Sequence, residues 1–303
     1  MRGFLGLTRR NVMIYFKDKS AVAFSLLTSV IVFVLYLIFI KGSYVDAIND
    51  SLNGLQEFVS SDEVEGLVGL ILLVGILGSA TITVPYCCLK TLIRDKENKI
   101  DFDISATPIK RWQIIVSYYT AAVFSASVVT LAIYAIGVGC IMGMYSVEFA
   151  ATDLMVGFGI LLLGNLSSSA IFLIMTMLFK SVATCDAFYG ILSSTSGFVI
   201  GAYMPLSTFS DTIQTICNLF PATHITILLR GRMMQGMLDK INRNIGGLDG
   251  GEFVRGFHDT FSFKANLFGH SMSESDMLLY VLGIFAVSLL VMIVTYSKTY
   301  KRK

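Results

Sequence analysis

Long apolar runs separated by short charged segments constrain this chain more than any other feature. A bilayer core is about 30 Å thick, and a helix needs roughly 20 mostly apolar residues to cross it. Six segments meet or approach this length, which predicts an all-α, polytopic integral membrane protein. The predicted transmembrane helices cover residues 22–40, 67–89, 114–140, 154–179, 187–204 and 277–297.

The fifth predicted span has a composition of its own. Its sequence, "AFYGILSSTSGFVIGAYM", is rich in glycine and serine, whereas the other five runs are long and nearly free of charge.

Two other interpretations of the apolar runs do not fit. A transmembrane β-barrel would show alternating segments of about ten residues in place of unbroken apolar runs. The first run is longer than the apolar core of a secretory signal peptide, so we expect it to remain as a membrane anchor.

The distribution of Lys and Arg predicts the orientation. Basic residues gather in the N-terminal segment and in the loop after the second span: Arg2, Arg9, Arg10, Lys17, Lys19, Lys90, Arg94, Lys96, Lys99, Lys110 and Arg111. The loop after the first span is acidic and contains only one lysine, Lys41. Basic loops stay in the cytoplasm. We therefore expect a multi-pass protein of the cell (plasma) membrane with both termini cytoplasmic.

Residues 1–21 precede the first span and mix apolar with basic side chains. This pattern predicts a helix lying in the headgroup region, although a positively charged flank that only sets topology would look similar. Residues 205–276 form the one large external region. Its apolar part, "IQTICNLFPATHITILL", could dip into the membrane, and its glycine-rich part predicts an exposed loop.

Several chemistries find no support in the sequence. No phosphate-binding G-x-x-x-x-G-K-[ST], H-E-x-x-H or G-x-S-x-G motif occurs, and no paired carboxylates lie within the apolar runs. His224, His258 and His270 are too far apart in sequence for a compact zinc motif, and we expect them to be exposed. The scattered cysteines predict free thiols. The chain is expected not to be an enzyme and to take its energy from a partner.

The charged stretch "RDKENKIDFDISATPIKRWQII" separates the second and third spans. Thr107 is the expected N-cap and Pro108 the first residue of a helix that continues into the third span. Residues 99–105 then form a separate short element. In it Ile100, Phe102 and Ile104 alternate with aspartates, so we expect apolar side chains to be presented to a partner.

Three segments together resemble the membrane subunit of a type-2 ATP-binding-cassette (ABC) exporter, the permease class typical of bacterial drug, antibiotic and polysaccharide export. The segment "RRNVMIYFKDKSAVAFSLL" resembles the interfacial elbow helix that enters span one. The charged stretch resembles the family's coupling loop. The segment "YMPLSTFSDTIQTICNLFPATHITILLRGRMMQG" resembles re-entrant external helices between spans five and six. Pro205, Pro221, His224 and Arg230 lie at the positions expected to mark this segment.

The resemblance implies a permease that works with a separate cytoplasmic ABC ATPase and with a second permease subunit, identical or different, in the lipid bilayer. ATP and magnesium would be bound by the ATPase, with no cofactor or metal in this chain and no nucleic-acid partner. The ATPase-coupling residues would be Arg94, Asp95, Glu97, Lys99, Ile100, Asp101, Phe102, Asp103, Ile104 and Ser105. Substrate would cross between two permeases, along spans one, two and five.

Candidates for lining or gating that path are Thr81, Thr83, Pro85, Ser193, Ser194 and Ser196. The small-residue patches around these serines could equally serve helix packing. The charge-poor spans favour a hydrophobic or amphipathic cargo, such as a drug, antibiotic, peptide or lipid-like molecule, moved out of the cell.

Two departures from the family pattern stand out. The coupling loop often has Gly-Thr where this chain has Lys99 and Ile100, and the external region after Arg232 is longer than a minimal member needs. The alternative function is a non-transporting sensor or assembly subunit that binds a partner through the external loop.

Overall fold

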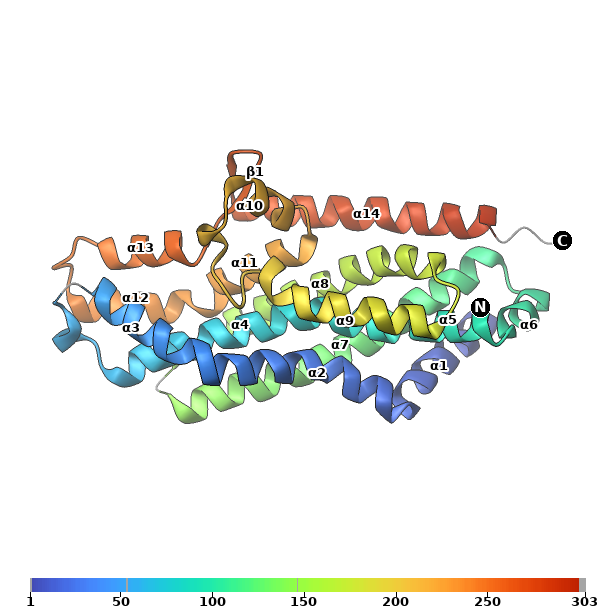
Figure 1. The fold of residues 1–303 in the computed structure, drawn as a ribbon, viewed down its shortest axis with the longest axis horizontal. Coiled ribbons are helices and arrows are strands. Elements are labelled where there is room, and N and C mark those ends of the chain that lie inside the picture. The colour runs from blue at the N-terminus through green and yellow to red at the C-terminus, as the bar shows by residue number, and fades with distance from the viewer. Residues whose placement is uncertain (1, 53, 146, 300–303) are drawn as a thin grey trace.

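The computed structural model describes residues 2–52, 54–145 and 147–299, and these are mostly helical (Figure 1). The helices of the first half are α1 (Arg2–Lys17), α2 (Lys19–Leu35), α3 (Lys41–Ser51), α4 (Ser61–Cys88), α5 (Lys90–Glu97), α6 (Ile100–Ala106) and α7 (Arg111–Met144). Those of the second half are α8 (Ala151–Leu178), α9 (Val182–Val199), α10 (Asp211–Asn218), α11 (Pro221–Met233), α12 (Gln235–Ile245), α13 (Glu252–Thr260) and α14 (Glu274–Thr299). A short antiparallel hairpin, β1 (Ala265–Leu267) and β2 (His270–Met272), is the exception to the all-α prediction.

The helices form an elongated bundle with two distinct ends (Figure 1). Helices α5 and α6 lie at one end, together with the start of α1 and the end of α14. Helices α3, α12 and α13 lie at the other end. Helix α4 runs through the centre, because its sequence is apolar on every side. In its most apolar window 89% of the residues are buried, against 17% in α14.

Four helical segments are long and apolar enough to cross a membrane: Ser61–Glu97, Arg111–Met144, Ala151–Leu178 and Glu274–Tyr296. Two bent pairs raise the number to as many as six, if each pair counts as one span. The first pair is α1 with α2, bent by 72°, and the second is α10 with α11, bent by 94°. Helix α9, which contains most of the predicted fifth span 187–204, is not among these candidates, whereas the pair α10 and α11 is. The protein is therefore a polytopic helical membrane protein with four to six candidate spans among its described residues.

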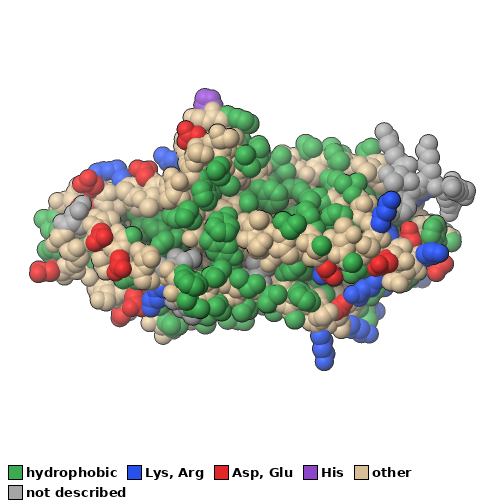
Figure 2. Space-filling view, in the orientation of Figure 1, with side chains coloured by type: hydrophobic (Ala, Val, Ile, Leu, Met, Phe, Trp, Pro, Cys, Tyr) green, Lys and Arg blue, Asp and Glu red, His purple; other side chains and the backbone are tan. Residues whose placement is uncertain are grey.

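The middle of the bundle presents apolar side chains outward. Exposed residues include Phe24 and Ile31 of α2, Phe124 of α7, and Leu279 and Leu290 of α14. Figure 2 shows hydrophobic side chains over this middle part, while charged side chains gather mainly toward the two ends. This distribution fits a belt of lipid around the bundle, with water at both ends.

The helix of the first span extends further than its apolar run. A π-helical turn at Tyr36–Ile40 joins α2 to α3, which continues to Ser51. Helix α4 then begins with a capping box, in which the Ser60 hydroxyl accepts from the backbone N–H of Glu63 and the Glu63 carboxylate accepts from the backbone N–H of Ser60. The acidic segment after the first span is thus largely helical.

A close approach between α4 and α11 predicts a packing effect at Gly78. A Cβ atom there would lie 2.2 Å from Thr226 Oγ1 and 2.8 Å from Ile200 Cδ1. We expect Gly78→Ala to cost about 1–3 kcal/mol, because overpacking a tight helix crossing forces side chains or backbone to move. Gly139→Ala in α7 is the control, since no atom lies within 4 Å of its added Cβ. Equal thermal midpoints for the two purified variants would contradict this packing argument.

Candidate functional site

The charged stretch between α4 and α7 folds into α5 and α6, with a sharp turn between them. Lys99, at the turn, has a left-handed backbone conformation with φ of 61°. The expectation that Thr107 starts the next helix is wrong. Thr107 instead ends α6, and its hydroxyl donates to the carbonyl of Ile104 at 2.6 Å. Helix α7 begins at Arg111 with Lys110 as its N-cap, and Pro108 lies in the short link before it.

Asp95 of α5 is the centre of a buried polar cluster. Its carboxylate is 2% exposed and accepts two hydrogen bonds from the Arg10 guanidinium, both at 2.7 Å. It also accepts one from the Tyr118 hydroxyl at 2.5 Å. Because Arg10 belongs to α1 and Tyr118 to α7, this one carboxylate joins three helices. The two parallel hydrogen bonds fix the orientation of the guanidinium relative to the carboxylate as well as the distance between them.

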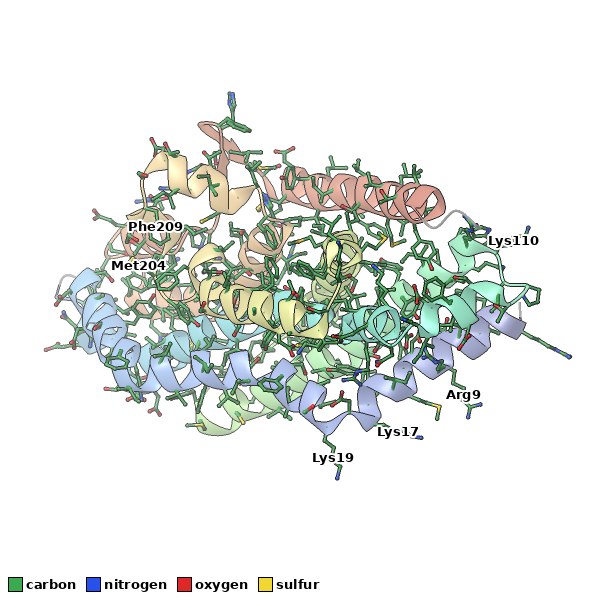
Figure 3. The ribbon with its side chains drawn as sticks, turned by 45° about the vertical axis from the view of Figure 1, so that its right-hand side comes forward. Arg9, Lys17, Lys19, Lys110, Met204 and Phe209 are labelled. Atoms are coloured by element: carbon green, nitrogen blue, oxygen red, sulfur yellow. The ribbon has the colours of Figure 1, made fainter. Side chains whose placement is uncertain are left out.

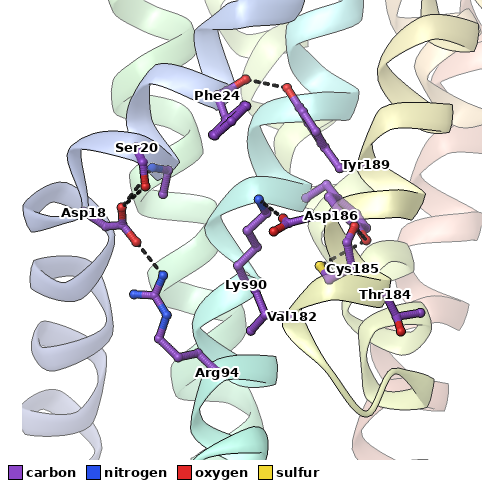
Figure 4. A network of polar contacts seen from close by, with 12 residues as sticks. Asp18, Ser20, Phe24, Lys90, Arg94, Val182, Thr184, Cys185, Asp186 and Tyr189 are labelled. Atoms are coloured by element: carbon purple, nitrogen blue, oxygen red, sulfur yellow. Dashed lines mark hydrogen bonds and ion pairs between the residues drawn. The ribbon is translucent and has the colours of Figure 1, made fainter.

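A second ion pair joins α5 to the bend between α1 and α2. Arg94 Nη2 lies 2.5 Å from Asp18 Oδ2 (Figure 4). Asp18 also accepts from the Ser20 hydroxyl at 2.6 Å and from the backbone N–H of Ala21 at 3.0 Å. The Ser20 hydrogen bond, followed by those from Arg94 and Ala21, lowers the pKa of Asp18 to about 2. The carboxylate therefore stays charged at neutral pH and caps α2.

The other side of α5 is held by α8 and α9. The backbone N–H of Val182 donates to Glu97 Oε2 at 3.2 Å, and Lys96 Nζ donates to the carbonyl of Met177 at 2.8 Å. Nearer the bundle, Lys90 forms an ion pair with Asp186 of α9 (Figure 4). Polar contacts therefore connect α5 to α1, α7, α8 and α9, so a displacement of α5 would also move these four helices.

Helix α6 presents one apolar side chain, rather than the three expected from the sequence. Phe102 is 68% exposed, whereas Ile100 and Ile104 are partly buried and Ile104 packs against the core. The reason is the helical period, which places residues four apart on one face and the residue between them on the opposite face. Asp101 is partly buried, and this burial raises its pKa, while Asp103 is exposed and Ser105 partly buried.

The residues expected to line a path lie in different environments. Thr81, Thr83 and Pro85 are buried within α4, and the two threonine hydroxyls donate to carbonyls of their own helix. On α9, Ser196 is buried, Ser193 is partly buried and Ser194 is exposed. The structure thus separates the α4 residues, which lie inside the chain, from an accessible polar strip on α9.

The segment expected to be re-entrant has sharp boundaries in the structure. Pro221 is the first residue of α11, where proline is favoured because its missing N–H needs no helical partner. The expectation that all three histidines are exposed holds only for His270, because His258 is partly buried, and it is wrong for His224. This residue is fully buried, its Nε2 lies 2.7 Å from the carbonyl oxygen of Asn218, and its ring packs on Tyr280. Pro205 precedes a short 3₁₀ turn that leads toward α10.

Arg230 has a structural role that the sequence alone did not reveal. It is 2% exposed, and its guanidinium donates to the carbonyls of Phe261 and Gly201, both at 2.6 Å. The guanidinium also donates longer hydrogen bonds to the carbonyls of Ile200 and Ser262. Arg230 therefore connects the end of α9 to the loop after α13. An arginine directly after an apolar run, as after "ITILL" here, is a signal of such a contact, but its partners are backbone atoms that sequence does not identify.

A family model described as "ABC-2 family transporter protein" matches residues 40–296. A search of curated proteins found no match. The matched range begins at Ile40, the last residue of the π-helical turn after α2, and reaches nearly to the end of α14. It therefore covers α5 and α6, the bent pair α10 and α11, and helices α12 and α13. The segment that resembles an elbow helix lies before the matched range, and the other two segments lie within it. The resemblance to a type-2 ABC permease is confirmed, and the chain belongs to the ABC-2 family as a transporter membrane (permease) subunit.

Proposed function

We propose that this chain is the permease half of an ATP-driven exporter and that α5 and α6 receive the movement of a separate ATPase. Family membership implies an ATPase partner. The observation that carries the proposal is the set of polar contacts from α5 to four other helices, combined with the exposed Phe102 on α6. A partner that grips α6 would move α5, and α5 would move the bundle.

In this mechanism the two short helices act as a lever. Coupling requires a contact whose geometry differs between two global states of the transporter. The Asp95 cluster would transmit displacement to α1 and α7, and the Glu97 contact would transmit it to the start of α9. The bound nucleotide would stay on the ATPase, with magnesium, and this chain would contribute no catalytic group.

The proposed topology has six spans and both termini in the cytoplasm of the cell. Basic side chains support it, because they cluster at the α5–α6 end. Figure 3 shows Arg9, Lys17 and Lys19 projecting from α1 and α2 away from the bundle, and Lys110 near the turn into α7. In this topology α1 would lie in the inner headgroup region as an elbow, and α10 with α11 would re-enter from outside.

A second permease copy or a related subunit would complete the transport path. We propose that the accessible strip on α9, which includes Ser194 and Thr195, faces that path together with α2. The buried Thr81, Thr83 and Pro85 would act behind it, as packing or flexing positions of α4. Exposed apolar side chains nearby, such as Phe24 and Ile191, favour a hydrophobic or amphipathic cargo.

The first test of this function concerns Phe102. We expect Phe102→Ala to lower export and to uncouple the ATPase activity of the co-purified complex, while the permease itself stays as stable as wild type. The reason is that Phe102 is exposed in the single chain and would be buried only by a partner. Phe268→Ala is a matched control, since this phenylalanine is 72% exposed on the hairpin at a distance from α6.

Two results would contradict the proposal. Affinity purification of the tagged chain in mild detergent should bring an ABC ATPase with it. If no ATPase is recovered, or if Phe102→Ala and Phe268→Ala behave alike, α6 does not transmit ATPase movement. A deletion of residues 239–270 that abolished function under those conditions would favour a sensor or assembly role for the external region.

A further inference from the structure

A polar cavity lies beside the re-entrant pair, outside the coupling site. Its volume is about 560 Å³, within the usual range for small-molecule sites. The lining comes from several elements that are far apart in sequence: α10, α13, the turn after Pro205 and the segment that includes the hairpin. The lining residues that carry charge or orphaned polar atoms are Asn218, Arg255, His258, Asp259 and Lys264.

Two polar atoms of this lining have no partner within the described residues. Asn218 is 2% exposed, and its amide nitrogen donates to the carbonyl of Asn266 at 2.8 Å, which fixes the orientation of the side chain. The Asn218 oxygen is buried without a donor, and Nε2 of His258 is buried without a hydrogen-bond partner. Burial lowers the pKa of His258, so at neutral pH its ring is uncharged. A ligand that carries hydroxyl donors would satisfy such atoms.

The charged groups favour an anion. Arg255 and Lys264 lie on different elements, and neither takes part in an ion pair among the described residues. Asp259 is the only acidic residue of the lining, and it can accept from a ligand hydroxyl. Arginine and lysine together suit a phosphate, the first by two parallel hydrogen bonds and the second as a point charge.

The helices around the cavity suit a position at a membrane surface. Helix α10 has Gln214 and Asn218 on the cavity side, and exposed Ile213, Ile216 and Leu219 on the opposite side. Figure 1 shows α10 and the hairpin beside the start of α14, where that apolar helix begins. An amphipathic helix at this level places apolar side chains toward lipid and polar ones toward the headgroups.

We propose that this cavity binds a glycerophosphate group, a phosphate anion that carries hydroxyl donors, supplied either by the headgroup of a phospholipid or by a soluble molecule. The phosphate contacts Arg255 and Lys264, and the hydroxyls donate to Asn218, His258 or Asp259. Ser262 also lines the cavity, and Arg230 holds the same loop to the end of α9. Occupancy therefore stabilises the contact between the external region and the bundle.

Two arms test the site and separate the sources. In the first, binding of sn-glycerol 3-phosphate to the detergent-purified protein is measured by calorimetry. In the second, the thermal midpoint is compared in nanodiscs of phosphatidylglycerol and of phosphatidylcholine. Arg255→Gln and Lys264→Gln are expected to weaken the affinity about tenfold in the first arm, or to abolish the phosphatidylglycerol stabilisation in the second. Arg243→Gln is the control, because Arg243 is an exposed arginine of α12 outside this cavity.

A response in the first arm without one in the second identifies a soluble ligand, and a response in the second arm identifies a lipid headgroup. The proposal is overturned if wild type responds in neither arm, or if Arg243→Gln loses the response as fully as Arg255→Gln does. Both substituted cavity residues have exposed side chains, so loss of folding does not obscure the result.

Discussion

Replacing Arg230 with methionine is expected to lower the thermal midpoint of the purified protein by roughly 5 °C or more. Methionine fills a similar volume but donates no hydrogen bond, so the carbonyls of Phe261 and Gly201 lose donors at 2.6 Å. Each buried carbonyl left without a partner costs about 1–3 kcal/mol. The loss should also release the external region, which would show as faster proteolysis between α13 and α14.

Arg232→Met provides the control for that result. Arg232 lies on the same helix, two residues further on, but its partner Glu274 is 58% exposed and their ion pair is solvated. Removing such a pair costs less than about 1 kcal/mol. Arg230→Lys should fall between the two, because a lysine keeps the charge but cannot reach two separated loops with a rigid fork. Equal midpoints for Arg230→Met and Arg232→Met would show that the guanidinium does not hold these loops.

The membrane-protein class could be predicted from sequence because it depends on the length of apolar runs, which are visible without tertiary contacts. Residues 67–88 of the predicted second span, for example, lie in α4, whose burial follows from its uniformly apolar composition. The structure of α6 was harder to predict from the sequence. Alternation of Ile100, Phe102 and Ile104 with aspartates predicted that these apolar side chains would be presented to a partner. The segment is too short for periodicity to identify its structure, and the helix that it forms leaves only Phe102 of the three exposed.

Long-range polar contacts could not be predicted at all. The partners Arg10 and Asp95 are separated by 85 positions, and nothing in either local sequence identifies the other. His224 illustrates the same limit, because its burial depends on Tyr280 and on the carbonyl of Asn218, which the 94° bend between α10 and α11 brings close. Local patterns thus predicted where short elements occur, whereas tertiary packing decided which of their side chains are available.

The Asp95 cluster should be essential for coupling, and Asp95→Leu is expected to reduce export by about tenfold or more. The substitution removes the acceptor of three hydrogen bonds from α1 and α7, each worth about 1.5–3 kcal/mol when it involves a charged group. Helix α1 would then lose its fixed position against α5. Export from cells and ATPase activity of the purified complex are the measurements, with the amount of assembled complex determined in parallel.

A double-mutant cycle separates this coupling from a general loss of stability. Arg10→Met combined with Asp95→Leu removes both charges, so the double variant should be less damaged than the sum of the single variants, with an interaction energy of about 1–3 kcal/mol. The reference pair is Lys41 with Glu65. Lys41 Nζ lies 2.8 Å from Glu65 Oε2, and the two side chains are 35% and 40% exposed. The double-mutant cycle of this solvated pair should give an interaction energy of less than about 1 kcal/mol. Strict additivity at Arg10 and Asp95 would mean that this ion pair does not couple α1 to α5. Force applied to α6 would then have to reach the bundle through the other contacts of α5, those with Tyr118, with Asp18 and with α8 and α9.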